Sequence, residues 1–420
     1  MSAGDRSGRG RRRQIWRGAI IFGLASCLAV AAGRSAVIEV LRNRDPQRVV
    51  SFSDDGRAVV RRLDDRMTAT SVLPTADELS REGRRALLSA PLTAGAARLL
   101  GLSAELRGDH FAGTKLHELA ERISRRDFRT QLALIELAVE RGDVAGALRH
   151  HDIALRTRAG GDALLFPILA SAIEDPAVRG PFAAIMATSP PWLGAFFAST
   201  LRAGGHSAAV AALVDRVGGL KSIDRSGQLD GLLLQGLAND RHYEQLRQRY
   251  LTMPGAGRDV LTAVRFDTAG VRPDRIPISW QIIRSEPLLA SFTKAETGGN
   301  LLDLSISLDP GNQALVARKL LFLPAGAYRF RAAVRSTEWT ADSTAWWVLK
   351  CALTKDEPVI WEGRPLGGDV VALDARPVVG AACPVQFLDL VVAAGADGQT
   401  PLELVAASPT LVRDGSAAAR

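Results

Sequence analysis

The hydrophobic and polar positions follow two different periods along the chain. Between residues 45 and 253, apolar residues recur at three- and four-residue spacing, with glycine at the breaks. This spacing places them on one face of a helix, so it predicts a series of short amphipathic helices. After residue 258 the period changes to two, as where Leu302, Leu304, Ile306 and Leu308 alternate with polar residues. That alternation predicts short antiparallel strands.

The fold class that these patterns predict is α+β and multidomain. An apolar helix occupies residues 1–44, a helical array residues 45–253, and an antiparallel β-sandwich residues 258–413. The clearest strand begins after the turn Pro324-Ala325-Gly326, where apolar residues alternate with Arg329 and Arg331. Such a strand buries one face and exposes the other to solvent.

The N-terminal segment has the pattern of a membrane or export signal. Residues 1–17 contain six arginines and one acidic residue, and residues 18–33 carry no charge. A membrane span needs about 20 apolar residues, so the helix has to continue past Arg34 through residues 36–40, with the arginine snorkelling. We expect a single-pass protein of the bacterial inner membrane, with the arginines in the cytoplasm and the bulk of the chain in the periplasm.

Two alternatives deliver the chain to the same side of the membrane. Ala29-Val30-Ala31 matches a small-residue cleavage site, and Arg12-Arg13 resembles a twin-arginine signal, which together indicate cleaved export. Leu24-Ala25-Ser26-Cys27 resembles a lipobox, in which Cys27 is lipidated. Because an exported chain meets an oxidising compartment, the remaining cysteines, Cys351 and Cys383, are expected to form a disulfide.

The helical array contains an internal repeat. Arg107-Gly108-Asp109 recurs as Arg141-Gly142-Asp143 after 34 residues, and each copy lies between two apolar helical segments. Asp109 and Asp143 are then expected to cap the second helix of each hairpin. With small and apolar residues such as Gly101 and Ala147 at the matching positions, the region resembles a degenerate tetratricopeptide array. That resemblance implies a stacked surface for a protein partner.

Charge and composition exclude several functions. From Arg258 to the C-terminus there are 17 basic and 18 acidic residues, so the excess positive charge lies at the N-terminus and nucleic acid is not an expected partner. All six histidines lie in the helical array, without the spacing of a metal site, and are expected at the surface and at helix ends. No catalytic residue, metal or cofactor is predicted.

The C-terminal region resembles the galactose-binding-like jelly rolls that serve as carbohydrate-binding modules. The likeness is carried by Leu323-Pro324-Ala325-Gly326-Ala327-Tyr328 and by the tryptophan-bearing strand that ends in Cys351. It implies that exposed aromatic and basic side chains contact a polysaccharide, although large aromatic residues also fill sandwich cores. The candidate glycan contacts are Trp339, Trp346, Trp347, Trp361, Arg329 and Arg331.

The sequence therefore favours a non-enzymatic, membrane-anchored envelope protein. Its helical repeats hold a protein partner and its β-sandwich binds glycan, as suits a scaffold for assembly or export of cell-surface polysaccharide. The alternative is a glycan-active hydrolase or lyase that carries a carbohydrate-binding module. Residues 258–413 contain no histidine, which excludes a nucleophile with a histidine base inside them.

Overall fold

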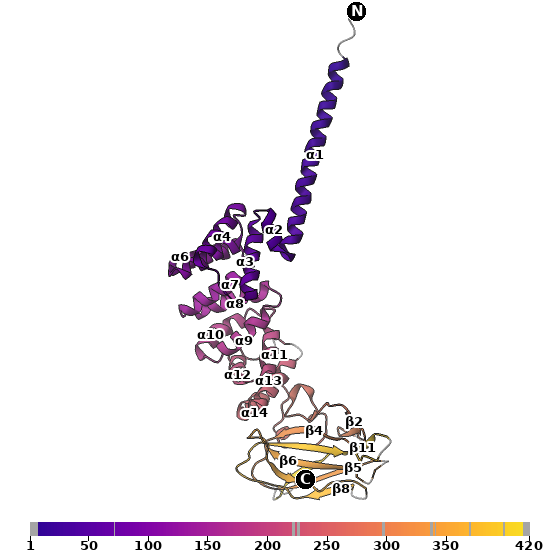
Figure 1. The fold of residues 1–420 in the computed structure, drawn as a ribbon. Coiled ribbons are helices and arrows are strands. Elements are labelled where there is room, and N and C mark those ends of the chain that lie inside the picture. Colours follow the sequence, from indigo (N-terminus) through magenta and orange to yellow (C-terminus); the bar gives the residue numbers. More distant parts are fainter. Residues whose placement is uncertain are drawn as a thin grey trace, which may run out of the picture. The chain divides into compact units, whose positions relative to one another are not determined.

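The computed structural model describes residues 7–70, 72–220, 223–224, 227–295, 299–336, 339–340, 342–368, 371–397 and 400–414. Part of the predicted basic N-terminus, residues 1–6, lies outside the described residues. The chain divides into two compact units, Met1–Leu165 and Phe166–Arg420, so the second combines helices with the strands. The predicted fold class, an apolar N-terminal helix followed by a helical array and antiparallel sheets, is confirmed (Figure 1).

The first unit is helical. Its helices are α1 (Ser7–Arg44), α2 (Pro46–Phe52), α3 (Gly56–Thr70), α4 (Ala76–Ser89), α5 (Ala94–Leu106), α6 (His110–Ile123), α7 (Phe128–Glu140) and α8 (Val144–Thr157). Helix α9 (Asp162–Ala172) crosses the division between the units. Within α1, the segment Leu24–Arg44 is long and apolar enough to cross a membrane, and none of it is buried inside the protein. This helix therefore has the length and composition of a membrane anchor or a signal sequence.

Two helical hairpins recur at the predicted period. Helices α5 and α7 begin 34 residues apart, at Ala94 and Phe128, and α6 and α8 begin at His110 and Val144, also 34 apart. The cap prediction is confirmed, because Asp109 accepts a hydrogen bond from the Ala112 amide at 2.9 Å. Asp143 accepts the corresponding bond from the Gly146 amide at 2.8 Å. Membership in the tetratricopeptide family stays a prediction.

The expectation that the histidines lie at the surface is wrong for three of the six. His117, His150 and His151 are buried in the first unit. Space for the His117 ring comes from Gly101 on the facing helix, where a Cβ atom would lie 2.8 Å from the imidazole Nε2. The helical period placed these residues on helices, but the small residue opposite decides how deeply a ring is buried.

In the second unit, helices precede the β-sandwich. Helices α10 (Pro176–Met186), α11 (Leu193–Ala203), α12 (Ser207–Arg216), α13 (Gln228–Asn239) and α14 (Tyr243–Thr252) follow α9. The antiparallel strands are β1 (Gln281–Ile282), β2 (Leu288–Lys294), β3 (Leu302–Leu308), β4 (Gln313–Leu321), β5 (Gly326–Arg335), β6 (Thr344–Cys351), β7 (Val359–Glu362), β8 (Ala372–Ala375), β9 (Val378–Val379), β10 (Gln386–Ala393), β11 (Leu402–Ala406) and β12 (Thr410–Arg413).

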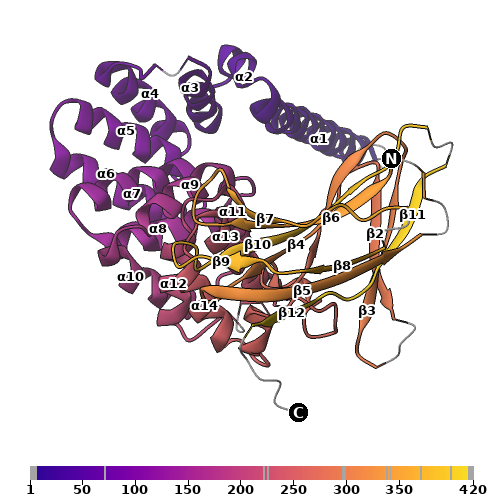
Figure 2. The same ribbon diagram turned by 90° about the horizontal axis from the view of Figure 1, so that it is seen from below.

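The strands form two sheets that enclose one core (Figure 2). One sheet has the order β1-β4-β10-β6-β7, and the other has the order β12-β5-β11-β3-β2, with β8 and β9 also paired to β5. Because alternate residues of a strand point to the same side, the inward positions of both sheets pack against each other. Phe266, Trp280 and Phe330 surround the indole of Trp347 with ring centroids 5.5 to 6.2 Å away.

Two further contacts close the sandwich. The predicted disulfide between Cys351 and Cys383 is present and joins the end of β6 to the segment before β10. The Tyr328 hydroxyl donates a hydrogen bond to the Pro324 carbonyl at 2.6 Å, which fixes the turn between β4 and β5. The helices are attached by Tyr243, at the start of α14, whose hydroxyl donates to the Ala352 carbonyl at 2.7 Å. This contact brings the α13–α14 turn close to the sheet that contains β4.

Candidate functional site

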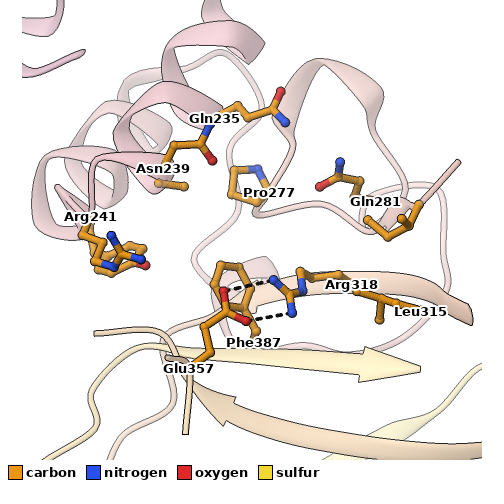
Figure 3. A pocket seen from close by; sticks show the side chains of 12 residues that line it. Gln235, Asn239, Arg241, Pro277, Gln281, Leu315, Arg318, Glu357 and Phe387 are labelled. Atoms are coloured by element: carbon orange, nitrogen blue, oxygen red, sulfur yellow. Dashed lines mark hydrogen bonds and ion pairs between the residues drawn. The ribbon is translucent and has the colours of Figure 1, made fainter. Parts of the chain in front are cut away.

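A polar pocket lies where the α13–α14 turn approaches this sheet (Figure 3). It has a volume of about 340 Å³, which is within the range of small-molecule sites. The helical side contributes Gln235, Ala238, Asn239, Arg241 and Tyr243; the strands and the segments next to them contribute Pro277, Gln281, Ile283, Leu315, Arg318, Glu357 and Phe387. All of these residues belong to the second unit.

The floor of the pocket is an ion-pair network centred on Arg318 of β4. Its guanidinium binds both carboxylate oxygens of Glu357, at 3.1 and 2.9 Å, and both of Asp389, each at 2.8 Å. Lys350 adds a third contact to Asp389 at 3.1 Å, so this carboxylate, which is 0% exposed, is fully compensated. Burial opposes the charge of Arg318, but the two carboxylates outweigh it and raise the pKa of the guanidinium. The charges of the floor therefore hold one another in fixed positions.

An aromatic ring supports this network. The Arg318 guanidinium carbon lies 4.5 Å from the centroid of the Phe387 ring, in cation–π geometry. Phe387 and Asp389 both point outward from β10, because the alternate residues Leu388 and Leu390 belong to the core. The strand period thus places an aromatic and an acidic side chain next to each other on the pocket side of the sheet.

Three amide side chains line the pocket without a protein partner. In the part of the chain that the structure describes, the side chains of Gln235, Asn239 and Gln281 make no hydrogen bond to protein groups. Each amide offers two donor hydrogens and one acceptor oxygen. In Figure 3 Gln235 and Asn239 extend from the helical side toward Pro277, and Gln281 lies on the other side of that proline. The pocket therefore presents both hydrogen-bond donors and acceptors.

Two pocket residues have a backbone conformation that favours glycine. Arg241 has φ +60° and Glu357 has φ +42°, and they are two of the three non-glycine residues with positive φ among the described residues. Arg241 follows α13 at a position where glycine is the usual helix-terminating residue. A side chain kept at such a position costs about 1 to 3 kcal/mol, and such residues gather at ligand sites. Both positions place a charged side chain at this pocket.

The glycan contacts predicted from the sequence do not come together. Trp347 is 0% exposed and fills the core, so it is not available to a ligand. Trp361 and Trp339 are half-buried and pack against the same core. Trp346 is half-buried on the outer face of β6, in the sheet opposite β5, which carries the predicted arginines. Apart from the buried Trp347, these glycan contacts stay predictions.

The two predicted arginines lie on an exposed face. Arg329 and Arg331 both bind Asp374 of β8, at 2.6 and 3.2 Å. These guanidinium groups lower the pKa of Asp374 to about 2. Cys27 is exposed on α1, and its lipidation stays a prediction. Among the described residues, no group of three histidine, cysteine or acidic side chains is placed to hold a metal ion.

The sequence did not predict these pocket residues, because they come from separate segments of the chain. Gln235 and Glu357 are more than a hundred positions apart, and tertiary contacts such as that of Tyr243 with Ala352 bring their segments together. One sequence signal pointed to the region. Asp389 interrupts the apolar run of β10, and Arg318 interrupts that of β4. Charged residues inside core strands are rarely buried without partners.

Comparisons with known proteins describe the β-sandwich alone. No family model and no curated protein matches the chain. The C-terminal family 22 carbohydrate-binding module of Clostridium thermocellum Xyn10B is similar at 14% identity, with 33% of this chain and 87% of that chain covered and a TM-score of 0.24. TmCBM61 in complex with β-1,4-galactotriose is similar at 12% identity, with 31% and 90% covered and a TM-score of 0.20.

A third similar structure comes from a different type of protein. The enzymatically active domain of bacteriophage CBA120 tailspike protein 4 matches at 7% identity, with 36% of this chain and 21% of that chain covered and a TM-score of 0.27. Likenesses at these scores assign no ligand to this chain.

Proposed function

We propose that this protein is a non-enzymatic, membrane-anchored glycan-binding protein, and that the pocket between the α13–α14 turn and the β4–β10 sheet holds the sugar. The observation that carries the proposal is the set of three unpartnered amides, Gln235, Asn239 and Gln281, around one polar cavity. Sugar hydroxyls are both donors and acceptors, as are these amides, so a polyol satisfies them in a way that an apolar ligand does not.

The charged groups of the pocket support binding rather than hydrolysis. Hydrolysis by paired carboxylates requires one carboxyl group that gives a proton to the leaving group and a second carboxylate that acts as a nucleophile or as a base toward water. Here Glu357 and Asp389 are both held by the same Arg318 guanidinium. Arg241 makes no hydrogen bond through its side chain within the described residues, so it is available to a carboxylate or hydroxyl group of a sugar.

The rest of the chain fits a tethered module. Helix α1 supplies the anchor, which leaves the chain from Asp45 onward on the periplasmic side by the positive-inside rule. The hairpins α5–α6 and α7–α8 offer a repeated surface for a protein partner. Together these parts support a scaffold that holds a polysaccharide close to a protein assembly at the membrane.

The test is a glycan array probed with the full-length protein in detergent micelles. Variants Asn239→Ala and Gln281→Ala are compared with Gln245→Ala, a control that removes an exposed amide of α14 outside the pocket. Loss of a hydrogen bond to a buried sugar costs about 1 to 1.5 kcal/mol, or about tenfold in affinity. We expect this loss for each pocket variant and no change for the control, with thermal unfolding unchanged in all three.

Arg241→Gly separates binding from stability. Because glycine adopts positive φ freely, this variant is expected to be as stable as the wild type or up to about 1 kcal/mol more stable, and yet to bind glycan less tightly. If Trp346→Ala abolishes binding while Asn239→Ala and Gln281→Ala bind as the wild type does, the pocket is the wrong site. Turnover of any polymer on the array would favour the alternative, a glycan hydrolase or lyase.

A further inference from the structure

A second pocket lies in the first unit, beside the end of α1. It has a volume of about 420 Å³ and is open to solvent. Its wall comes from α1, α3, the first turn of α5 and the segment between α6 and α7. Four arginines line it, and these are Arg42, Arg57, Arg61 and Arg126. Four guanidinium groups around one cavity are unusual, because like charges repel unless anions compensate them.

Internal ion pairs leave two of these arginines uncompensated. Arg42 binds Asp55 at 3.0 Å, and Arg61 binds Asp65 at 3.1 Å. Arg57 and Arg126 are exposed and make no ion pair with an acidic side chain in the described part of the chain.

The two acidic residues in the wall of the pocket do not compensate the charges of Arg57 and Arg126. Asp64 and Asp127 both bind the buried guanidinium of Arg98, at 2.9 and 3.3 Å. Asp64 also lies 3.6 Å from Arg129. The first turn of α5, which begins at Ala94, adds partial positive charge of the same sign. The pocket therefore has a net positive field and two free bidentate donors.

The fold fixes the distance from this pocket to the apolar part of α1. The predicted span continues past Arg34 through residue 40, and Arg42 lies two residues further along the same helix, or about 3 Å at 1.5 Å per residue. Helix α2 packs back along α1, since Arg34 donates a hydrogen bond to the Phe52 carbonyl at 3.4 Å. Phe52 is 44% exposed, as aromatic residues at a membrane interface often are.

We propose that this arginine pocket binds the phosphate of an anionic phospholipid headgroup, taking α1 as the membrane anchor of the proposed function. Guanidinium groups bind phosphate oxygens in bidentate geometry, and Arg57 and Arg126 supply two such groups. The predicted membrane span ends near residue 40, just before Arg42, so the pocket lies at the level of the lipid phosphates and its guanidinium groups reach them directly. The pocket then holds the first unit against the membrane surface at a second point besides α1.

The experiment measures binding of dihexanoyl-phosphatidylglycerol to the full-length protein in neutral detergent. Dihexanoyl-phosphatidylcholine and inorganic phosphate are the competing probes. The double variant Arg57→Gln and Arg126→Gln is compared with Arg84→Gln and Arg122→Gln, which remove the same charge from exposed positions of α4 and α6 outside the pocket. A basic residue near an anionic surface contributes about a factor of five. We therefore expect the pocket variant to bind phosphatidylglycerol at least tenfold more weakly and the control to change less than twofold.

Two outcomes would overturn the proposal. Equal weakening by the control variant would mean that the lipid responds to net charge alone and not to this pocket. Displacement of phosphatidylglycerol by an equal concentration of inorganic phosphate would assign the pocket to a soluble anion. Membrane anchoring is checked separately by carbonate extraction of cell membranes, so failure of the anchor and failure of the pocket are distinguishable. Thermal unfolding verifies that all variants fold.

Discussion

Lys319 is a charged residue inside the β-sandwich, and its replacement tests how this core is built. It lies opposite Leu388 in the β4–β10 ladder, and directly opposite residues share a face, so its side chain points into the core with Leu388. The side chain is 0% exposed, and in the described part of the chain its Nζ has no hydrogen-bond partner. Burial lowers the pKa of this ammonium to about 7 from 10.5, with Asp267 and Asp259 opposing the change.

The sign of the effect follows from these two values. Between pH 10.5 and 7, the unfolded chain binds a proton at Lys319 that the folded protein excludes, so protonation favours unfolding. The stability that neutral Lys319 allows is fully present above pH 10.5 and is lost as the pH falls through about 7. At about 1.4 kcal/mol per pKa unit, the loss amounts to about 3 to 5 kcal/mol at pH 7 and about 1 kcal/mol at pH 10.

Lys319→Met removes the titrating group and keeps a similar volume. We expect the variant to raise the free energy of unfolding at pH 7 by about 3 to 5 kcal/mol relative to the wild type, and by about 1 kcal/mol at pH 10. The assay is urea unfolding of the full-length protein in detergent at both pH values. Tryptophan fluorescence is the signal, because five of the seven tryptophans lie in the β-sandwich region.

The control is Lys294→Met, which changes an exposed lysine of β2 and is expected to change stability by less than about 0.5 kcal/mol at either pH. Titration of other groups at pH 10 affects wild type and variant alike, so it cancels in the difference. The reasoning is refuted if Lys319→Met destabilises the protein at pH 7. It is also refuted if the variant gains the same free energy at both pH values, because the gain would then come from packing alone.

Two further predictions concern buried groups. Burial and, to a smaller extent, the charge of Arg98 lower the pKa of His117 to about 4, so the stability that the neutral imidazole provides is present above pH 6.5 and is lost as the pH falls through about 4. Thermal unfolding should show the first unit losing up to about 3 kcal/mol over this range, and His117→Leu should remove this loss. The loss must persist in a His110→Leu control. Replacing Cys351 and Cys383 with alanine should lower the free energy of unfolding of the β-sandwich by about 3 to 4 kcal/mol, because the disulfide closes a loop of 32 residues. A midpoint of urea unfolding that is unchanged from the wild type would contradict this prediction.

Much of the fold was predictable because it depends on local periods. The 34-residue spacing of the two Arg-Gly-Asp turns placed four helices and both aspartate caps correctly. The alternation from Leu302 to Leu308 coincides with β3, and the expectation of export predicted the pairing of Cys351 with Cys383. Each signal lies within one segment or one pair of residues, where the hydrophobic pattern and the turn residues leave few alternatives.

The sequence by itself therefore determined the types of element, their order, the apolar leader and the disulfide. Tertiary structure decided which tryptophans are core, since Trp346 and Trp347 differ only in the face of β6 from which they project. It also decided that amides of α13 meet charges of β4 and β10, and that four arginines from separate segments share one pocket. The physical reason is that periodicity fixes the face of each element, whereas contact between faces depends on packing across the whole chain.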